Sequence, residues 1–234
     1  MMRVLAVGAH PDDLEILCGG TLARFVAEGH QVVMAHACWG DKGHGKIPHE
    51  EVAEVRDREA KAAAQVIGAE PMVLGFSDCE LYVNEESILR FVDMIRAVKP
   101  DLIITHHPND YHSDHHAVTK LVTDASFSAT LPYFVTDEAL HPVAPPIYYM
   151  ETLAGLNFTP EEYVDITSTF ETKKEAMLQH ASQVSWISEH HATDVLDMIE
   201  TTARFRGWQC GVPYAEGFQL MREWGRVFPK RLLP

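Results

Sequence analysis

Strand-like and helix-like stretches alternate through the first half of the chain, and no hairpin signal joins the strands. Apolar runs of strand length lie at Arg3 to Ala9, Gln31 to Cys38, Met72 to Phe76 and Asp101 to Thr105. Helical patterns lie at Leu14 to Glu28, Glu50 to Ile67, Glu85 to Val98 and His115 to Ser128. Strands separated by helices pair in parallel through right-handed crossovers. The pattern therefore predicts an α/β fold, a three-layer Rossmann-like sandwich with a mostly parallel central sheet.

The second half of the chain is less regular. Its predicted elements are a strand at Ile147 to Met150, a short apolar piece near Tyr163 to Ile166, and helices over Thr169 to Ser188 and Thr193 to Phe205. We find no internal repeat and no convincing linker, so residues 1–234 are expected to form a single domain.

Charge and hydropathy exclude some classes of partner. Thirty-four acidic residues against nineteen basic ones give a formal charge of -15, which would repel a phosphate backbone and argues against nucleic acid as the partner. The chain has no run of about 18 apolar residues that would cross a bilayer. The segment His10-Pro11-Asp12-Asp13 interrupts the first strand before the apolar core of a signal sequence is complete. We therefore expect no membrane insertion and a cytoplasmic location.

The cysteines give no sign of a disulfide framework or a zinc knuckle. They form no C-x-x-C pair and have apolar neighbours, so we interpret them as reduced thiols in the core. They are Cys18, Cys38, Cys79 and Cys210.

Two polar clusters follow strands that are neighbours in the predicted sheet. In a doubly wound sheet of order 3-2-1-4-5, the first and fourth strands are adjacent, and ligands bind at their carboxyl ends. His10 to Asp13 follows the first strand, and Asp110 to His116 follows the fourth. Each cluster alone has a simpler interpretation: an Asp-capped helix start for the first and a solvated turn for the second. Their convergence at one switch point favours a functional site over both.

The residue types suit a catalytic zinc site, which needs three imidazole or carboxylate ligands and an open position for water. His10, Asp13 and His115 would supply the ligands for one Zn²⁺ per chain. Asp12 would act as general base on the zinc-bound water. His112, three residues before a ligand, would donate to the oxyanion.

At these residues the sequence resembles the PIG-L or LmbE-like de-N-acetylases, which act on glucosaminyl intermediates of mycothiol, bacillithiol and glycolipid synthesis. Their first motif, A-H-P-D-D-x-E-x-x-x-G-G, matches Ala9 to Gly20, and their second, D-x-H-x-D-H, matches Asp110 to His115. Later segments also match: Asp165 to Thr167, Lys173 to Gln183 and Gly211 to Phe218. The resemblance thus extends over nearly the whole chain. It does not cover Ala129 to Pro146, for which we expect a part in shaping the substrate pocket.

The resemblance implies a zinc-dependent hydrolase that removes the N-acetyl group from an N-acetylglucosamine-type sugar or glycoconjugate. It implies zinc at His10, Asp13 and His115 and a general base at Asp12. It also implies that Asp114 orients His112, which stabilises the oxyanion or protonates the leaving amine. The family often forms trimers and hexamers, so a homo-oligomer is expected.

Two candidate substrate-binding residues come from the same resemblance. Arg56 falls where the family has a substrate-anchoring arginine on a helix, although a solvated helix charge paired with Glu59 is the simpler interpretation. Tyr214 lies in the closing motif and is a second candidate for the oxyanion role.

The competing class is a non-catalytic metal-binding or nucleotide-binding Rossmann-like domain. The turn after the first strand lacks G-x-G-x-x-G, and its two aspartates lie where a pyrophosphate would bind. A non-catalytic metal binder would not need the base at Asp12. Which sugar and aglycone the substrate carries is not encoded in any motif that we identify.

Overall fold

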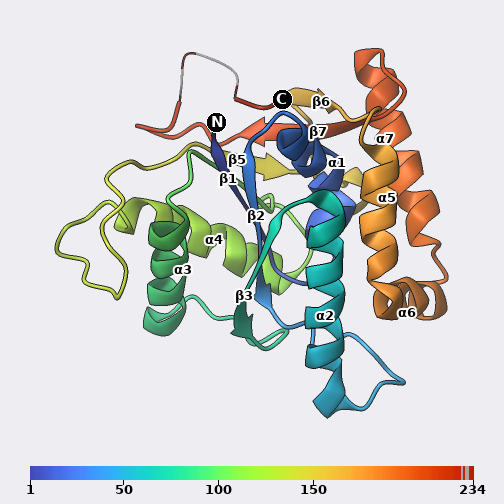
Figure 1. Ribbon diagram of the computed structural model, residues 1–234, viewed down its shortest axis with the longest axis horizontal. Helices are drawn as coiled ribbons and strands as arrows, with labels where there is room; N and C mark the ends of the chain where they lie inside the picture. Colours follow the sequence, from blue (N-terminus) through green and yellow to red (C-terminus); the bar gives the residue numbers. More distant parts are fainter. Residues whose placement is uncertain (228, 230–231) are drawn as a thin grey trace.

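A mixed sheet forms the centre of the protein. The computed structural model describes every residue except 228, 230 and 231 (Figure 1). Its strands are β1 (Arg3–Gly8), β2 (Gln31–Cys38), β3 (Glu70–Phe76), β4 (Leu102–Thr105), β5 (Ile147–Met150), β6 (Glu162–Asp165) and β7 (Ala215–Leu220). Their order is β3-β2-β1-β4-β5-β7-β6. Strands β1 to β5 pair in parallel, whereas β7 runs antiparallel to β5 and β6. The predicted α/β class with a mostly parallel sheet is confirmed.

Helices cover both faces of this sheet. They are α1 (Asp13–Ala27), α2 (His49–Ile67), α3 (Glu85–Val98), α4 (Ser113–Ser128), α5 (Phe170–Gln179), α6 (Ala181–His191) and α7 (Val195–Cys210), with a 3-10 turn η1 (Leu153–Gly155). Apolar residues of α1, α2, α5 and α7 pack on one face, and those of α3 and α4 on the other (Figure 1). Val4 and Leu5 of β1 point to opposite cores, so this strand is buried on both sides, as parallel strands usually are.

The second half of the chain departs from the prediction in two places. The helix predicted over Thr169 to Ser188 is two helices, because His180 adopts a non-helical ψ of 56° between α5 and α6. The His180 side chain is fully buried, with Nε2 3.1 Å from the Glu15 carboxylate. A contact with a residue so distant in sequence leaves no mark on the local helical pattern. In addition, β7 was not predicted as a strand, and it inserts between β5 and β6.

Residues 129–146 lie against α3. The guanidinium of Arg96 donates hydrogen bonds to the carbonyls of Ala129 and Leu131 and to the hydroxyl of Thr136. Not one residue of this segment lines the cavity described below. The expectation that it shapes the substrate pocket is therefore wrong.

Two of the four cysteines also differ from the prediction. Cys18 and Cys38 are buried, but Cys79 and Cys210 are exposed. Cys79 adopts a left-handed φ of 61° in the loop after β3. Among the described helices, none combines the length and apolar character needed to traverse a bilayer.

Candidate metal centre and active site

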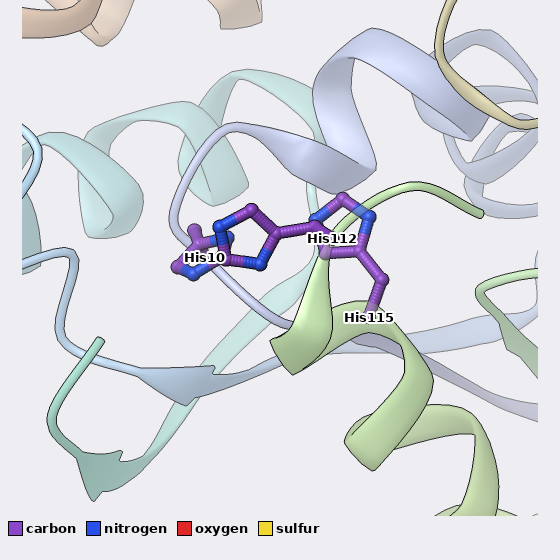
Figure 2. A group of neighbouring side chains, drawn as sticks. All are labelled: His10, His112 and His115. Atoms are coloured by element: carbon purple, nitrogen blue, oxygen red, sulfur yellow. The ribbon is translucent and has the colours of Figure 1, made fainter. Parts of the chain in front are cut away.

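The register between β1 and β4 brings the two polar clusters together. Val4 pairs with Leu102 and Val7 with Thr105, so both strands end at the same edge of the sheet. The loop after β1 and the start of α4 therefore meet there, as predicted. Figure 2 shows the rings of His10, His112 and His115 gathered at this meeting point. One potential ligand atom from each of the three lies within 4.8 Å of the others.

The carboxylate of Asp13 lies at the centre of the predicted ligand set. Its Oδ1 is 3.3 Å from His115 Nε2, and its Oδ2 is 3.5 Å from His10 Nδ1. Ligand atoms of a tetrahedral zinc site with bonds of about 2.1 Å are separated by about 3.4 Å. Both contacts are close to this separation, and each histidine faces a different oxygen of the Asp13 carboxylate.

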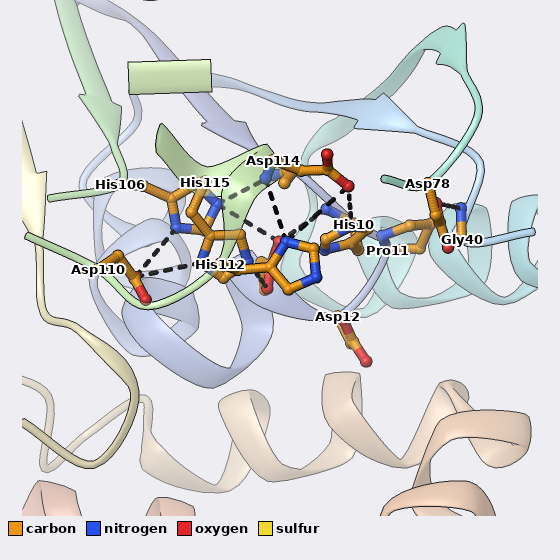
Figure 3. A network of polar contacts seen from close by, with 12 residues as sticks. His10, Pro11, Asp12, Gly40, Asp78, His106, Asp110, His112, Asp114 and His115 are labelled. Carbon is orange, nitrogen blue, oxygen red and sulfur yellow. Dashed lines mark hydrogen bonds and ion pairs between the residues drawn. The ribbon is translucent and has the colours of Figure 1, made fainter. Parts of the chain in front are cut away.

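Each of the two histidines has a carboxylate on its other ring nitrogen. His10 Nε2 is 3.0 Å from Asp114 Oδ2, and His115 Nδ1 is 3.1 Å from Asp110 Oδ2 (Figure 3). Metal-binding histidines usually have such a partner, which fixes the orientation and tautomer of the ring. Asp114 was expected to orient His112. Its Oδ2 is 3.9 Å from His112 Nδ1, farther than it is from His10 Nε2.

Buried acidic groups make the centre favourable for a cation. Burial opposes the charged form of His10, but hydrogen bonds with Asp114 and Asp13 outweigh it and raise the pKa of His10 to about 10. For His115, burial is likewise outweighed, chiefly by the charge of Asp13, and the pKa rises to about 9. A divalent metal ion would balance the charge of the same carboxylates in place of these protons.

Sequence reasoning missed two members of the centre, His106 and Asp110. His106 is fully buried and stacks on His115 with ring centroids 3.8 Å apart. Its Nε2 lies 3.3 Å from Asp13 Oδ2 and accepts a hydrogen bond from the backbone N–H of Ala9. Asp110 opens the second motif, which was the available signal for it, whereas His106 lies outside both motifs.

Asp12 lies beside the predicted ligands, but its carboxylate points away from the histidine rings. Its φ of 119° is rare for a residue other than glycine, and in Figure 3 its carboxylate is directed away from the histidines. Burial raises the pKa of Asp12 to about 6, against the opposing charge of Arg56. Backbone strain of this kind is concentrated at functional sites.

Arg56 fixes this turn and is not a solvated helix charge. The residue is 2% exposed, and its Nη2 lies 3.3 Å from Asp12 Oδ2. The guanidinium also donates to the carbonyls of Pro11 and Gly40. A Cβ at Gly40 would lie 2.5 Å from Arg56 Nη1 and displace the guanidinium, and the φ of 74° at this position also favours glycine. Glu59, the alternative partner, instead accepts hydrogen bonds from Ser182.

His112 caps the helix that carries His115. Its Nδ1 accepts a hydrogen bond from the backbone N–H of Asp114, so the neutral ring carries its proton on Nε2. Burial, followed by the charges of His10 and His115, lowers the pKa of His112. The ring is thus held neutral, with one N–H free to donate.

Tyr214 is not part of this site. Its ring stacks on Phe170 at 3.9 Å, and its hydroxyl lies 3.3 Å from Glu200 Oε1. It does not line the cavity, so the structure gives no support for a substrate-binding or oxyanion role.

A cavity of about 750 Å³ opens above the centre. Its walls include His10, Asp12, Asp13, Arg56, His112 and His115. On the opposite side, residues 152–157 and the region of α6 and α7 contribute to the lining. Pockets of roughly 300–1,000 Å³ typically enclose small-molecule ligands.

The fold and the site together define an α/β protein with a candidate catalytic metal centre at the switch point of its sheet. A family model described as PIG-L, GlcNAc-PI de-N-acetylase, matches residues 5–126, and the chain belongs to this family. The resemblance inferred from the two motifs is confirmed.

Similar proteins include both deacetylases and a hydratase. The chain is 29% identical to a diacetylchitobiose deacetylase of Thermococcus kodakarensis, over 94% of this chain and 83% of that one. It is 26% identical to a 4-oxalmesaconate hydratase of Pseudomonas putida, over 97% and 89%. The crystal structure of 4-carboxy-2-hydroxymuconate hydratase from Pseudomonas putida superposes with a TM-score of 0.84 at 25% identity, covering 99% of this chain and all of that one. These relatives support the conclusion that the protein is an enzyme.

Proposed function

We propose that the protein is a zinc-dependent hydrolase that removes the N-acetyl group from an N-acetylglucosamine-type sugar or glycoconjugate. The observation that carries the proposal is the arrangement of His10, Asp13 and His115, with Asp12 and His112 beside them in one cavity. When bound, zinc would lower the pKa of a water to about 7 and polarise the amide carbonyl.

The residues around the proposed metal site have different roles in amide hydrolysis. Asp12 takes the proton of the attacking water and returns it to the sugar nitrogen as the C–N bond breaks, which releases acetate and the free amine. Arg56 holds the Asp12 carboxylate in position. His112 donates its Nε2–H to the oxygen that becomes negative as the carbonyl is attacked. Asp110 and Asp114 hold the ligand imidazoles in the tautomers that face the centre.

The charge of the cavity favours a neutral amide over an anionic substrate. In the part of the chain that the structure describes, the only lysine and arginine that line it are Lys42 and Arg56. Lys42 Nζ pairs with Glu80 at 2.7 Å, and Arg56 with Asp12. Both cations are therefore neutralised within the protein, whereas a polycarboxylate would need free ones.

Hydration of an unsaturated carboxylate is the second candidate function, because the similarity to the hydratases covers nearly the whole chain. Both reactions need an activated water on the same scaffold. The difference lies in the substrate that the cavity accepts.

A substrate panel separates the two candidates. Zinc-loaded protein is incubated with N-acetylglucosaminides, and free amine and acetate are measured. In parallel, it is incubated with conjugated unsaturated dicarboxylates, and loss of their ultraviolet absorbance is followed. Equimolar amine and acetate from the glycosides are expected. Hydration of the dicarboxylates without amine release would show that the protein is a hydratase and not a deacetylase.

A further inference from the structure

The cavity has two halves of different chemistry. Every carboxylate, lysine and arginine that lines it, within the described residues, belongs to the half around the candidate metal centre. The other half, here called the apolar wall, is formed mainly by Ile16, Leu153, Leu156, Trp186, Ile187 and Met198. Uncharged polar residues such as Thr152 and Asn157 interrupt it. Three separate segments of the chain, α1, residues 152–157 and the α6–α7 region, converge to build it.

The loop that carries Leu153 and Leu156 is held in an unusual conformation. Ala154, Gly155 and Asn157 all have positive φ, between 57° and 70°. The Thr152 hydroxyl donates to the Leu156 carbonyl at 2.5 Å and closes the loop. Strained backbone persists only where the surroundings fix it, and it is common at ligand-binding sites.

A buried ion pair between Arg206 and Glu151 packs against this loop. Arg206 Nε of α7 lies 2.9 Å from both carboxylate oxygens of Glu151, which follows β5. A Cβ on Gly155 would lie 2.6 Å from Glu151 Oε1 and 2.9 Å from Arg206 Nη2, so the loop packs directly on the pair. The apolar wall is therefore preorganised, which lowers the entropic cost of binding.

Burial sets the direction in which a substrate lies. Asp13 and His115 are 9% and 4% exposed, whereas Leu156 is 69% exposed. The amide that reacts must reach the buried end. The rest of the substrate, including an aglycone on the ring carbon next to the one that carries the amide, then extends past the apolar wall toward solvent.

We propose, building on the deacetylase function, that the substrate is a glycoside whose aglycone is apolar, either aromatic or alkyl, and that the apolar wall binds this aglycone. The described residues of the wall include no lysine or arginine to pair with a phosphorylated or carboxylated aglycone, and the one basic side chain among them is the imidazole of His191. Because the glycosidic bond stays intact and the aglycone takes no part in the bond changes at the amide, its contacts are the same in ground and transition states. They lower KM and leave kcat nearly unchanged.

Steady-state kinetics with two glycosides test this inference. The ratio of kcat/KM for benzyl N-acetylglucosaminide over the methyl glycoside is measured on zinc-loaded protein. We expect a ratio of about 10 or more, carried by KM, because burying part of an aromatic ring stabilises the complex. Leu156→Gln should lower this ratio at least about threefold. Leu140→Gln, a matched change at an exposed loop leucine outside the cavity, should leave it unchanged.

Each alternative result has a distinct meaning. Equal kcat/KM for the two glycosides, or a ratio that Leu156→Gln leaves unchanged, overturns the inference while the deacetylase function stands. A longer N-acyl chain that gains more than the benzyl group, with the gain lost in Leu156→Gln, assigns the wall to the acyl group and also overturns it. If neither glycoside is hydrolysed, the proposed function fails. Calorimetric binding of the same two glycosides then decides, since equal affinities contradict an apolar wall.

Discussion

The two parts of the molecule contribute differently to the site. Strands β1 to β4 with α1 to α4 supply the three candidate metal ligands, the candidate base and the candidate oxyanion donor. From the part beyond β5 come residues 152–157 and the α6–α7 region, which supply most of the apolar wall. The chemistry thus depends on two short loops whose meeting is fixed by parallel strand order, and the shape of the cavity depends on packing between distant segments.

Buried charges join these two parts. Glu216 of β7 accepts hydrogen bonds from the backbone N–H groups of Gly20 and Thr21 in α1, at 3.0 and 2.8 Å. Lys173 of α5 pairs with the same carboxylate. The second link joins Glu15 to His180. Burial would raise the pKa of Glu15, but the charge of His180 outweighs it and lowers the pKa. The later part therefore also holds α1, whose first residue is Asp13.

The largest effect is expected in the parallel part, from removal of a ligand. His115→Ala should lose both zinc and activity, because two remaining protein ligands hold the ion far more weakly. Elemental analysis after dialysis measures the zinc. The control is His49→Ala, which changes an exposed histidine that does not line the cavity and should keep the metal. Full occupancy in His115→Ala would exclude this residue as a ligand and make His106 or His112 the candidate.

The second-largest effect is expected on stability, at the Glu216 carboxylate that joins the later part to α1. Lys173→Met leaves the Glu216 carboxylate buried without its cation. We expect the free energy of unfolding, measured in urea, to fall by about 3 kcal/mol. Lys174→Met is the control, since Lys174 is partly exposed and forms longer pairs with Glu171 and Glu200 and a cation–π contact with Phe170. It should cost less than about 1 kcal/mol. Equal losses in the two variants would show that Lys173 does not support the Glu216 carboxylate that binds α1.

Replacing the base should separate chemistry from metal binding. Asp12→Asn keeps the size of the side chain but cannot accept a proton, so turnover should fall about 100-fold or more. Zinc content and KM should change little. Loss of zinc together with activity would make Asp12 a ligand, and unchanged turnover would remove it from the mechanism.

The smallest effect is expected outside the cavity. Tyr214→Phe keeps the stack on Phe170 and removes only the hydroxyl near Glu200. We expect kcat/KM for the N-acetylglucosaminides to stay within about twofold of the unchanged protein. A fall in turnover by about tenfold or more would instead mean that the hydroxyl acts in the transition state. That result would restore Tyr214 to the site and contradict the division between the two parts.

Local patterns predicted the parallel part well, because its signals are local. Short apolar runs and helix-ending glycines such as Gly29 and Gly68 gave β1 to β4 and α1 to α4 to within a few residues. The convergence of His10 and His115 then followed from strand order alone. The single-domain organisation, cytoplasmic location and homo-oligomer stay predictions.

Long-range contacts explain what local patterns could not give. At the break between α5 and α6, the buried side chain of His180 contacts Glu15. Asp110 opens the second motif, but its contact with His115 depends on the tertiary structure. Likewise, Asp114 is adjacent in sequence to His115 but its carboxylate faces His10, because the fold brings the two loops together. Such partners are set by tertiary structure and carry no periodic signal.

Zinc titration of the metal-free protein tests the central claim most directly. Protein stripped with a chelator is titrated with zinc while acetate release from an N-acetylglucosaminide is followed. We predict no activity without metal and a linear rise that ends at one zinc per chain, with free amine and acetate formed in equal amounts. Full acetate release by metal-free protein, or none at any zinc level, would contradict a zinc-dependent deacetylase built on His10, Asp13 and His115.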